Sequence, residues 1–445
     1  MSAGLVLILV VALAYLATHL AFDWIARRFL IVSGAEYLLL GILLGPQVSG
    51  VLSVEAVESF APLTTLALGW IGAIVGVQFA IPALVQIRSQ TYKLALLQSL
   101  LTVAFVAGLE VIALAWLFDV PYTVSLPPGL ALGAIATASS PSAIAVASRR
   151  LGRRGPVVRL LQVATSIDSF VAVLVLGLLL CLVHPASPGL DRQLTATEWA
   201  VVSIGIGAVG GLLFHLFLGG ERERDRLFIA LAGALIFVSG AAAYLGLSPL
   251  LASLVMAATL ANTSENREQI AQTLYGAERP FYFVLLVFAG ASWRPSLQAW
   301  WWLPVVLFLA ARYVGKVGGA RLATRISGSL DELGPDWGRA LIGQGGLALA
   351  LGLDYLPHAG ALAPNIVFSA AVASVLLTDL SAARIVRSVV LPFVPGGEAL
   401  ARRVEEATEG SVEPNGAAES APAAAALGGP GSPGGATGPV PPAGG

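Results

Sequence analysis

Residues 157–183 read VVRLLQVATSIDSFVAVLVLGLLLCLV, and Asp168 is the only acidic residue in this stretch. A helix rises about 1.5 Å per residue, so the stretch can cross a hydrocarbon core about 30 Å thick. Asp168 then lies near the middle of the bilayer, where an ionised carboxylate facing lipid costs several kcal/mol. We therefore expect Asp168 to face a cavity or a partner and to be functional. The alternative is a structural carboxylate that caps a helix or stays in a permanent ion pair.

The whole chain has the composition of a membrane protein. Of its 445 residues, 57% are hydrophobic and 11% are charged, and the mean hydropathy is +0.83. Soluble domains carry about 25% charged residues. The net charge of −1 suggests no nucleic-acid partner. The single Cys181 allows no internal disulfide, and the histidines lack ligand spacing, so we expect no metal site and no cofactor.

Apolar runs recur along the chain to about residue 395, and they predict an all-α polytopic protein with thirteen spans. The expected spans are 4–21, 30–45, 60–81, 93–118, 128–148, 157–183, 197–219, 227–245, 247–262, 281–293, 298–320, 339–356 and 362–382. Residues 1–21 lack the charged start and cleavage site of a signal peptide, so we interpret them as a retained span.

The distribution of Lys and Arg orients these spans. With the N-terminus outside, nearly all basic residues fall in cytoplasmic loops or in the cytoplasmic C-terminal segment, as the positive-inside rule requires. The exceptions are Arg192 and Arg294 in outer loops, and Arg312 and Lys316 within the eleventh span. We expect an integral protein of the plasma membrane.

A weak internal likeness suggests a repeat. Residues 34–46, GAEYLLLGILLGP, are similar to residues 246–262, GLSPLLASLVMAATLAN, which lie seven spans later. Because seven is odd, the two halves have opposite orientation, and we expect inverted six-helix repeats, a feature of secondary transporters. The expected domains are a transmembrane domain of residues 1–395, with repeats at about 4–183 and 227–382 and a linker helix at 197–219, and a disordered cytoplasmic tail of residues 396–445, rich in Gly, Pro, Ala and Ser.

Two predicted helices carry interruptions. In residues 134–147, AIATASSPSAIAVA, Pro141 has no N–H, so the carbonyl of Thr137 loses its helical donor. The hydroxyls nearby belong to Thr137, Ser139, Ser140 and Ser142. In the corresponding span of the other half, residues 343–346 read GQGG and include Gln344. Broken helices at corresponding positions indicate a transport site, where free carbonyls coordinate cations. The alternative is a proline kink and glycines that serve only close packing.

Three further charged residues are candidates. Arg312 and Lys316 lie one turn apart, and a cation at that depth can compensate the charge of Asp168. For Lys316 the alternative is snorkelling to the inner interface. Glu110, in the fourth span, is a second buried acid with either a functional role or a structural partner.

Taken together, residues 30–385 resemble the sodium/hydrogen exchangers of the monovalent cation/proton antiporter superfamily. The likeness rests on the order and spacing of EYLLLGILLGP, ATASSPSAIAVASRRLGRRGPVVRLLQVATSIDSFVAV, LGLSPLLASLVMAATLAN, RPFYFVLLVFAG, ARYVGKVGGARL and GQGGLALAL. It implies a homodimer in which a core domain with two crossing broken helices moves as an elevator. It also implies that Asp168 binds the cation together with Ser139 or Ser140, and that Arg312 best matches the basic residue of the family.

The chain departs from the family at one position. Family members carry Asn-Asp or Asp-Asp in the sixth span, whereas here the pair is Ile167-Asp168 or Asp168-Ser169, depending on the alignment. In the second alignment Ser169 replaces the essential acid.

Our hypothesis is a transporter that exchanges Na⁺ or K⁺ for protons across the bilayer, with Asp168 as the shared site. The sequence carries no paired-Asp motif, metal-ligand spacing or nucleophile beside a base, so we expect no enzyme. The alternatives are a K⁺ efflux transporter, a Na⁺-coupled organic anion carrier, and a non-transporting sensor or scaffold that keeps the fold.

Overall fold

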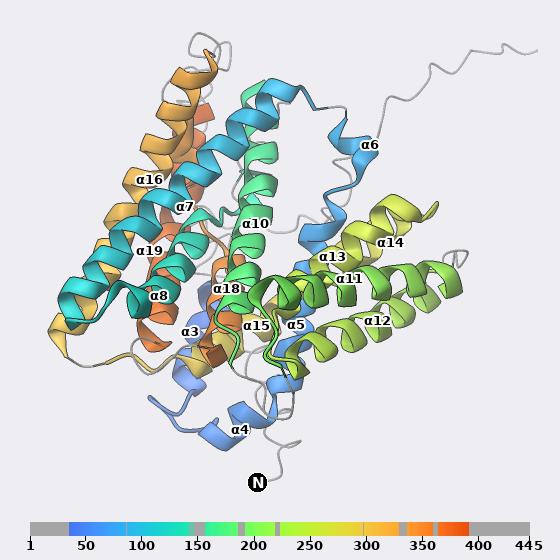
Figure 1. Ribbon diagram of the computed structural model, residues 1–445, viewed down its shortest axis with the longest axis horizontal. Coiled ribbons are helices and arrows are strands. Elements are labelled where there is room, and N and C mark those ends of the chain that lie inside the picture. Colours follow the sequence, from blue (N-terminus) through green and yellow to red (C-terminus); the bar gives the residue numbers. More distant parts are fainter. Residues whose placement is uncertain are drawn as a thin grey trace, which may run out of the picture.

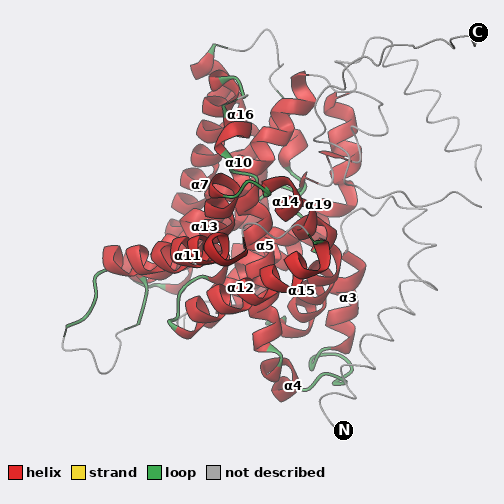
Figure 2. Cartoon of the chain, turned by 90° about the vertical axis from the view of Figure 1, so that its right-hand side faces the viewer, coloured by secondary structure: helices red, strands yellow, loops and turns green. Residues whose placement is uncertain are grey.

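The computed structural model describes residues 35–85, 87–141, 144–145, 156–185, 192–218, 223–296, 298–328, 336–358 and 364–390. Within these ranges all regular elements are helices, and no strand occurs among them (Figure 2). The expected first span, the start of the second and the C-terminal tail lie outside the described residues.

The first half of the chain forms helices that coincide with the expected second to seventh spans. They are α3 (Ala35–Leu44), α4 (Val54–Ser59), α5 (Ala61–Val77), α6 (Ile81–Leu84), α7 (Ser89–Phe118), α8 (Tyr122–Thr137), α10 (Pro156–Leu182) and α11 (Ala196–Leu218). The short helices α4 and α6, which flank α5, were not expected from the apolar pattern.

The second half forms helices that coincide with the eighth to thirteenth spans, together with one helix at Arg267–Gly276 that the apolar pattern did not predict. They are α12 (Arg224–Tyr244), α13 (Pro249–Thr263), α14 (Arg267–Gly276), α15 (Glu278–Ser292), η2 (Ala299–Trp302), α16 (Leu303–Ser327), η3 (Trp337–Leu341), α18 (Gly346–Tyr355), η4 (Leu356–His358) and α19 (Pro364–Val390). By length and composition, five described helices can cross a membrane: Ser89–Phe118, Val158–Leu182, Ala196–Phe217, Arg224–Tyr244 and Trp300–Ser327. The number of thirteen spans and the inverted repeat stay predictions.

The helices form two packed groups. Figure 1 shows α7, α8, α16 and α19 on one side of the molecule and α11 to α14 on the other, with α10 and α18 between them. Glycine allows α5 to pack closely against the second group: a Cβ at Gly72 or Gly76 of α5 would lie 2.3 or 2.1 Å from a backbone oxygen of α13. Small residues at helix contacts are typical of membrane proteins, because they let backbones approach.

Two interruptions of helical structure meet inside the first group. Helix α8 ends at Thr137, and residues 138–140 are not helical. The other interruption, residues 342–345, lies between η3 and α18. The backbone N–H of Ser140 donates to the carbonyl of Gly343 at 2.8 Å. Both interruptions fall where the sequence places them, and a direct hydrogen bond joins them.

Candidate functional site

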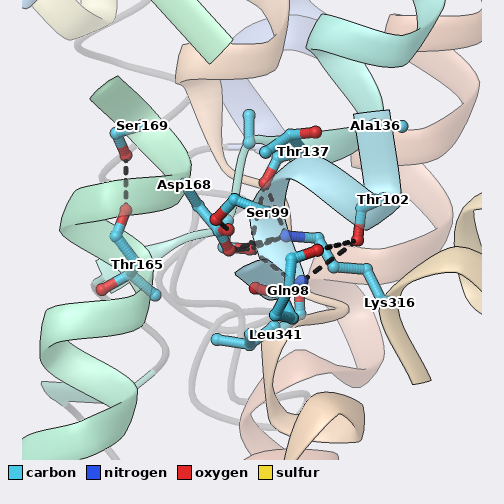
Figure 3. Close-up of polar contacts among 12 residues, drawn as sticks. Gln98, Ser99, Thr102, Ala136, Thr137, Thr165, Asp168, Ser169, Lys316 and Leu341 are labelled. Atoms are coloured by element: carbon cyan, nitrogen blue, oxygen red, sulfur yellow. Dashed lines mark hydrogen bonds and ion pairs between the residues drawn. The ribbon is translucent and has the colours of Figure 1, made fainter. Parts of the chain in front are cut away.

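Asp168 lies on α10, and its side chain is fully buried. Its two oxygen atoms accept from two serine hydroxyls (Figure 3): Ser99 Oγ on α7 lies 2.5 Å from Oδ1, and Ser139 Oγ, after α8, lies 2.7 Å from Oδ2. Lys316 Nζ on α16 lies 2.6 Å from Oδ2, and both members of this ion pair are completely inaccessible to solvent. The carboxylate thus faces polar partners from three elements and is closed from solvent in this conformation.

The ammonium group of Lys316 is surrounded by oxygen. Besides Asp168 Oδ2, it lies 2.6 Å from the carbonyl oxygen of Thr137 and 2.9 Å from Ser139 Oγ. An ammonium has three hydrogens, so each contact uses one of them. The carbonyl of Thr137 is the one that Pro141 leaves without a helical donor. Lys316 therefore stabilises the first interruption and Asp168 at the same time.

The guanidinium of Arg312 contacts both interruptions. Its Nε and Nη2 donate to the carbonyls of Ala136 and Ala138 at 3.1 and 3.2 Å, and its Nη1 donates to the carbonyl of Ile342 at 2.6 Å. These carbonyls lie at helix ends, where no intrahelical donor is available. The sequence resemblance matches Arg312 best to the basic residue beside the acid, whereas in the structure Lys316 forms the ion pair.

The remaining predicted residues of the two interruptions act through short contacts around this cluster. The hydroxyl of Thr137 donates to the carbonyl of Gly133 at 3.0 Å, so Thr137 faces Lys316 with its carbonyl and not its side chain. Gln344 Nε2 donates to the carbonyl of Ile135 at 2.6 Å. Gly345 has φ +64° and ψ −177°, a conformation that is essentially restricted to glycine. Glycine at this position permits the sharp turn into α18.

A buried acid beside two interrupted helices is the arrangement that the sequence suggested. The family model described as "Sodium/hydrogen exchanger, transmembrane" matches residues 36–388. The chain belongs to the sodium/hydrogen exchanger family. Its members are transporters and not enzymes, and the chain is an integral membrane protein.

Solved exchanger structures share the fold. The structure of the sodium proton antiporter MjNhaP1 from Methanocaldococcus jannaschii at pH 8 has a TM-score of 0.64 and 18% identity, covering 87% of this chain and 100% of that chain. An electron-microscopy map of the same antiporter has a TM-score of 0.58 and 18% identity, covering 92% and 100%. At this identity the likeness shows the fold alone. No curated protein sequence matches the chain significantly.

Two candidates lie apart from the cluster in this exchanger. Ser169 Oγ donates to the carbonyl of Thr165 at 2.8 Å along α10, on the side away from Lys316 (Figure 3). Glu110 lies on the same helix as Ser99, eleven residues further along and so about 16 Å away. Its side chain is fully buried, and neither carboxyl oxygen has a hydrogen-bond partner among the described residues.

Helix α7 contributes polar residues to the site that were not predicted from the sequence. Ser99 reaches Asp168, and Gln98 and Thr102 pack behind it: Thr102 Oγ1 accepts from Gln98 Nε2 at 3.1 Å and donates to the carbonyl of Gly315 on α16 at 3.2 Å. All three are buried. Polar residues three and four positions apart in an otherwise apolar helix share one face, so this spacing could have identified a polar contact surface on α7.

Proposed function

We propose that this chain exchanges a monovalent cation, Na⁺ or K⁺, for protons, and that Asp168 binds both ions in turn. Membership in the exchanger family supports cation/proton antiport in general. The assignment to Asp168 depends on one observation: a positively charged group, the ammonium of Lys316, already lies between Asp168 Oδ2, Ser139 Oγ and the carbonyl of Thr137 at 2.6–2.9 Å.

Those three oxygens are suitable ligands for an alkali cation. Carboxylate, hydroxyl and backbone carbonyl oxygens replace the water around such an ion, and interrupted helices supply them inside a membrane. We propose that the cation displaces the ammonium of Lys316 from these oxygens. Arg312 and Gln344 keep the free carbonyls of the two interruptions bonded, and Ser140 holds the interruptions together, so the site keeps its shape when Lys316 leaves.

Proton binding is the other half of the exchange. Because the site is buried, an ionised Asp168 without a cation or Lys316 beside it would carry a large desolvation cost. A bound proton or a bound cation removes that cost. We propose that the empty site, in which Lys316 pairs with Asp168, stays on its side and that only the loaded site changes sides; this obligatory loading couples the two fluxes in opposite directions.

We further propose an elevator movement in a homodimer of the plasma membrane. In this proposal α7, α8, α10, α16, α18 and α19 form the moving core and carry every residue of the cluster around Asp168. The group around α5, α11, α12 and α13 is the static partner. The domain boundaries and the outside position of the N-terminus stated above belong to the same proposal.

The test is ion flux in proteoliposomes that hold the purified wild-type chain, Asp168→Asn, or Asp336→Asn as the matched control. Asp336 makes a surface ion pair with Arg321, and both side chains are substantially exposed, so its amide variant should transport normally. Na⁺, K⁺ and Li⁺ are each added in a separate measurement. We expect Na⁺ or K⁺ to dissipate an imposed proton gradient in the wild type and in the control. Asp168→Asn should not respond.

Full flux in Asp168→Asn would refute the assignment of the site. Absence of flux with every cation in a folded wild-type protein would instead favour the non-transporting sensor or scaffold. An organic anion carrier would require an anion in addition to Na⁺ for any flux, so adding and omitting anions separates it from an exchanger.

A further inference from the structure

The two carboxylate oxygens of Asp168 have different surroundings. Oδ2 accepts from Lys316 Nζ at 2.6 Å and from Ser139 Oγ at 2.7 Å, and both donors belong to the proposed cation site. Oδ1 accepts from Ser99 Oγ of α7 at 2.5 Å (Figure 3). The carboxylate therefore has one oxygen that meets the proposed cation site and one that meets Ser99.

The hydroxyl of Ser99 has a choice of acceptor. Its oxygen lies 2.5 Å from Asp168 Oδ1 and also 2.9 Å from the carbonyl oxygen of Ala95, one turn earlier on α7. A serine hydroxyl has one hydrogen to donate and two lone pairs that accept. Only one of these two contacts can use the hydrogen at any time. Ser99 is fully buried, so water does not supply a third partner.

We propose that Oδ1 is the oxygen of Asp168 that binds the transported proton, and that Ser99 is the positioning residue for that proton. This inference rests on the proposed function. When a proton adds to Oδ1, the new O–H donates to Ser99 Oγ, and the hydroxyl hydrogen of Ser99 turns to the carbonyl of Ala95. When the proton leaves, the hydrogen of Ser99 turns back to the carboxylate.

This arrangement satisfies the carboxyl group in both charge states. Oδ2 is the poorer place for the proton, because the ammonium of Lys316 lies 2.6 Å from it and cannot accept a hydrogen bond from a protonated oxygen. Gain or loss of the proton at Oδ1 requires only rotation of the Ser99 hydroxyl, because its two acceptors, Asp168 Oδ1 and the carbonyl of Ala95, are both within hydrogen-bond distance. Proton and cation therefore compete for one carboxylate at different oxygens, and each oxygen has its own serine.

The test separates the two serines by kinetics. Ser99→Ala removes a charge-assisted hydrogen bond from the ionised carboxylate and a weaker one from the neutral acid, so it favours the protonated form. The pH of half-maximal exchange should rise by about one to two units. At a pH high enough to ionise Asp168, the apparent KM for the cation should stay within about twofold of wild type. Ser139→Ala, by contrast, removes a cation ligand and should raise that KM at every pH.

Conservative variants exclude a merely structural role for Ser99. Ser99→Thr keeps the hydroxyl and should keep the wild-type pH profile, whereas Ser99→Cys keeps the volume with a weak donor and should show a smaller alkaline shift. If Ser99→Ala does not fold, these two variants still test whether the hydroxyl of Ser99 positions the proton. An infrared carboxylic C=O band that is absent in Asp168→Asn should shift in the Cys variant and stay in the Thr variant.

An unchanged pH profile and an unchanged band in the Ala and Cys variants would overturn this inference. The proposed function would then still stand, provided that Asp168→Asn abolishes exchange. If Asp168→Asn transports normally, the proposed function fails first, so the two failures are distinguishable.

Discussion

At the scale of single residues, the site is a set of buried charges that satisfy each other. Asp168 and Lys316 are fully buried and form an ion pair at 2.6 Å, and Arg312 donates to the carbonyls of three residues. Removing one partner of a buried pair leaves an uncompensated charge, whereas removing both can be neutral. The free energies of unfolding of the single and double variants can therefore be compared to test whether the two residues are paired.

The first prediction concerns this ion pair. Lys316→Met keeps most of the side-chain volume and leaves Asp168 unpaired, so the free energy of unfolding should fall by about 3–5 kcal/mol. The double variant with Asp168→Asn should recover most of that loss, because neither charge remains. Denaturant unfolding in detergent measures all three variants. A double variant whose loss equals the sum of the two single losses would contradict the pairing.

The sequence predicted the acid and the interruptions better than it predicted their partners. A single carboxylate in an apolar run and a proline or glycine run inside a span are local signals, so Asp168, Pro141 and residues 343–346 could be identified directly. Which of Arg312 and Lys316 reaches Asp168 depends on the rotation of α16 against α8 and α10. The contact of Ser99 depends on the packing of α7 against α10, which no local pattern fixes.

At the scale of elements, the two interruptions form one unit. The N–H of Ser140 donates to Gly343, Gln344 donates to Ile135, and Ser139 Oγ lies 3.0 Å from the carbonyl of Leu341. Each interruption therefore supplies partners for the free backbone groups of the other. A change in the backbone of one should be transmitted to the other and to Asp168.

The second prediction tests this unit through Gly345. A Cβ there would lie 3.1 Å from Ser140 Oγ, and the backbone conformation is one that other residues adopt only with strain. Gly345→Ala should lower the free energy of unfolding by about 1–3 kcal/mol and slow exchange. Gly318→Ala on α16 is the control, since a Cβ there meets nothing within 4 Å. Equal stability and equal exchange rates in the two variants would show that the turn is not constrained.

At the scale of the whole molecule, the turn between α12 and α13 contacts two elements of the proposed core, α18 and the end of α10. His184, after α10, lies 2.7 Å from the carbonyl of Leu245, and His358, after α18, lies 3.0 Å from the carbonyl of Gly246. Ser248 beside the turn donates to the buried carboxyl of Asp354 on α18 at 2.5 Å. In the proposed elevator these contacts connect the core to its static partner, so movement must break them.

The third prediction is that these contacts stabilise the present conformation. His184→Ala and His358→Ala should each lower the free energy of unfolding by about 1 kcal/mol, the usual contribution of a hydrogen bond. Both variants should also increase the rate at which a thiol reagent labels Ser139→Cys in a chain that carries Cys181→Ala. The reason is that the core then leaves its present, closed conformation more often. His215→Ala is the control, since its Nδ1 has no partner among the described residues. If the labelling rate stays at the level of the His215→Ala control, the two histidines stabilise only their own loops and do not hold the core in place.

The central claim is that a proton and a cation compete for Asp168, and proton release on cation binding tests it most directly. Na⁺ or K⁺ is added to the purified chain in weakly buffered detergent solution, and the released protons are measured with a pH indicator. We predict release from the wild type that diminishes as the starting pH is raised, and none from Asp168→Asn. Release of the same size from Asp168→Asn would contradict the account.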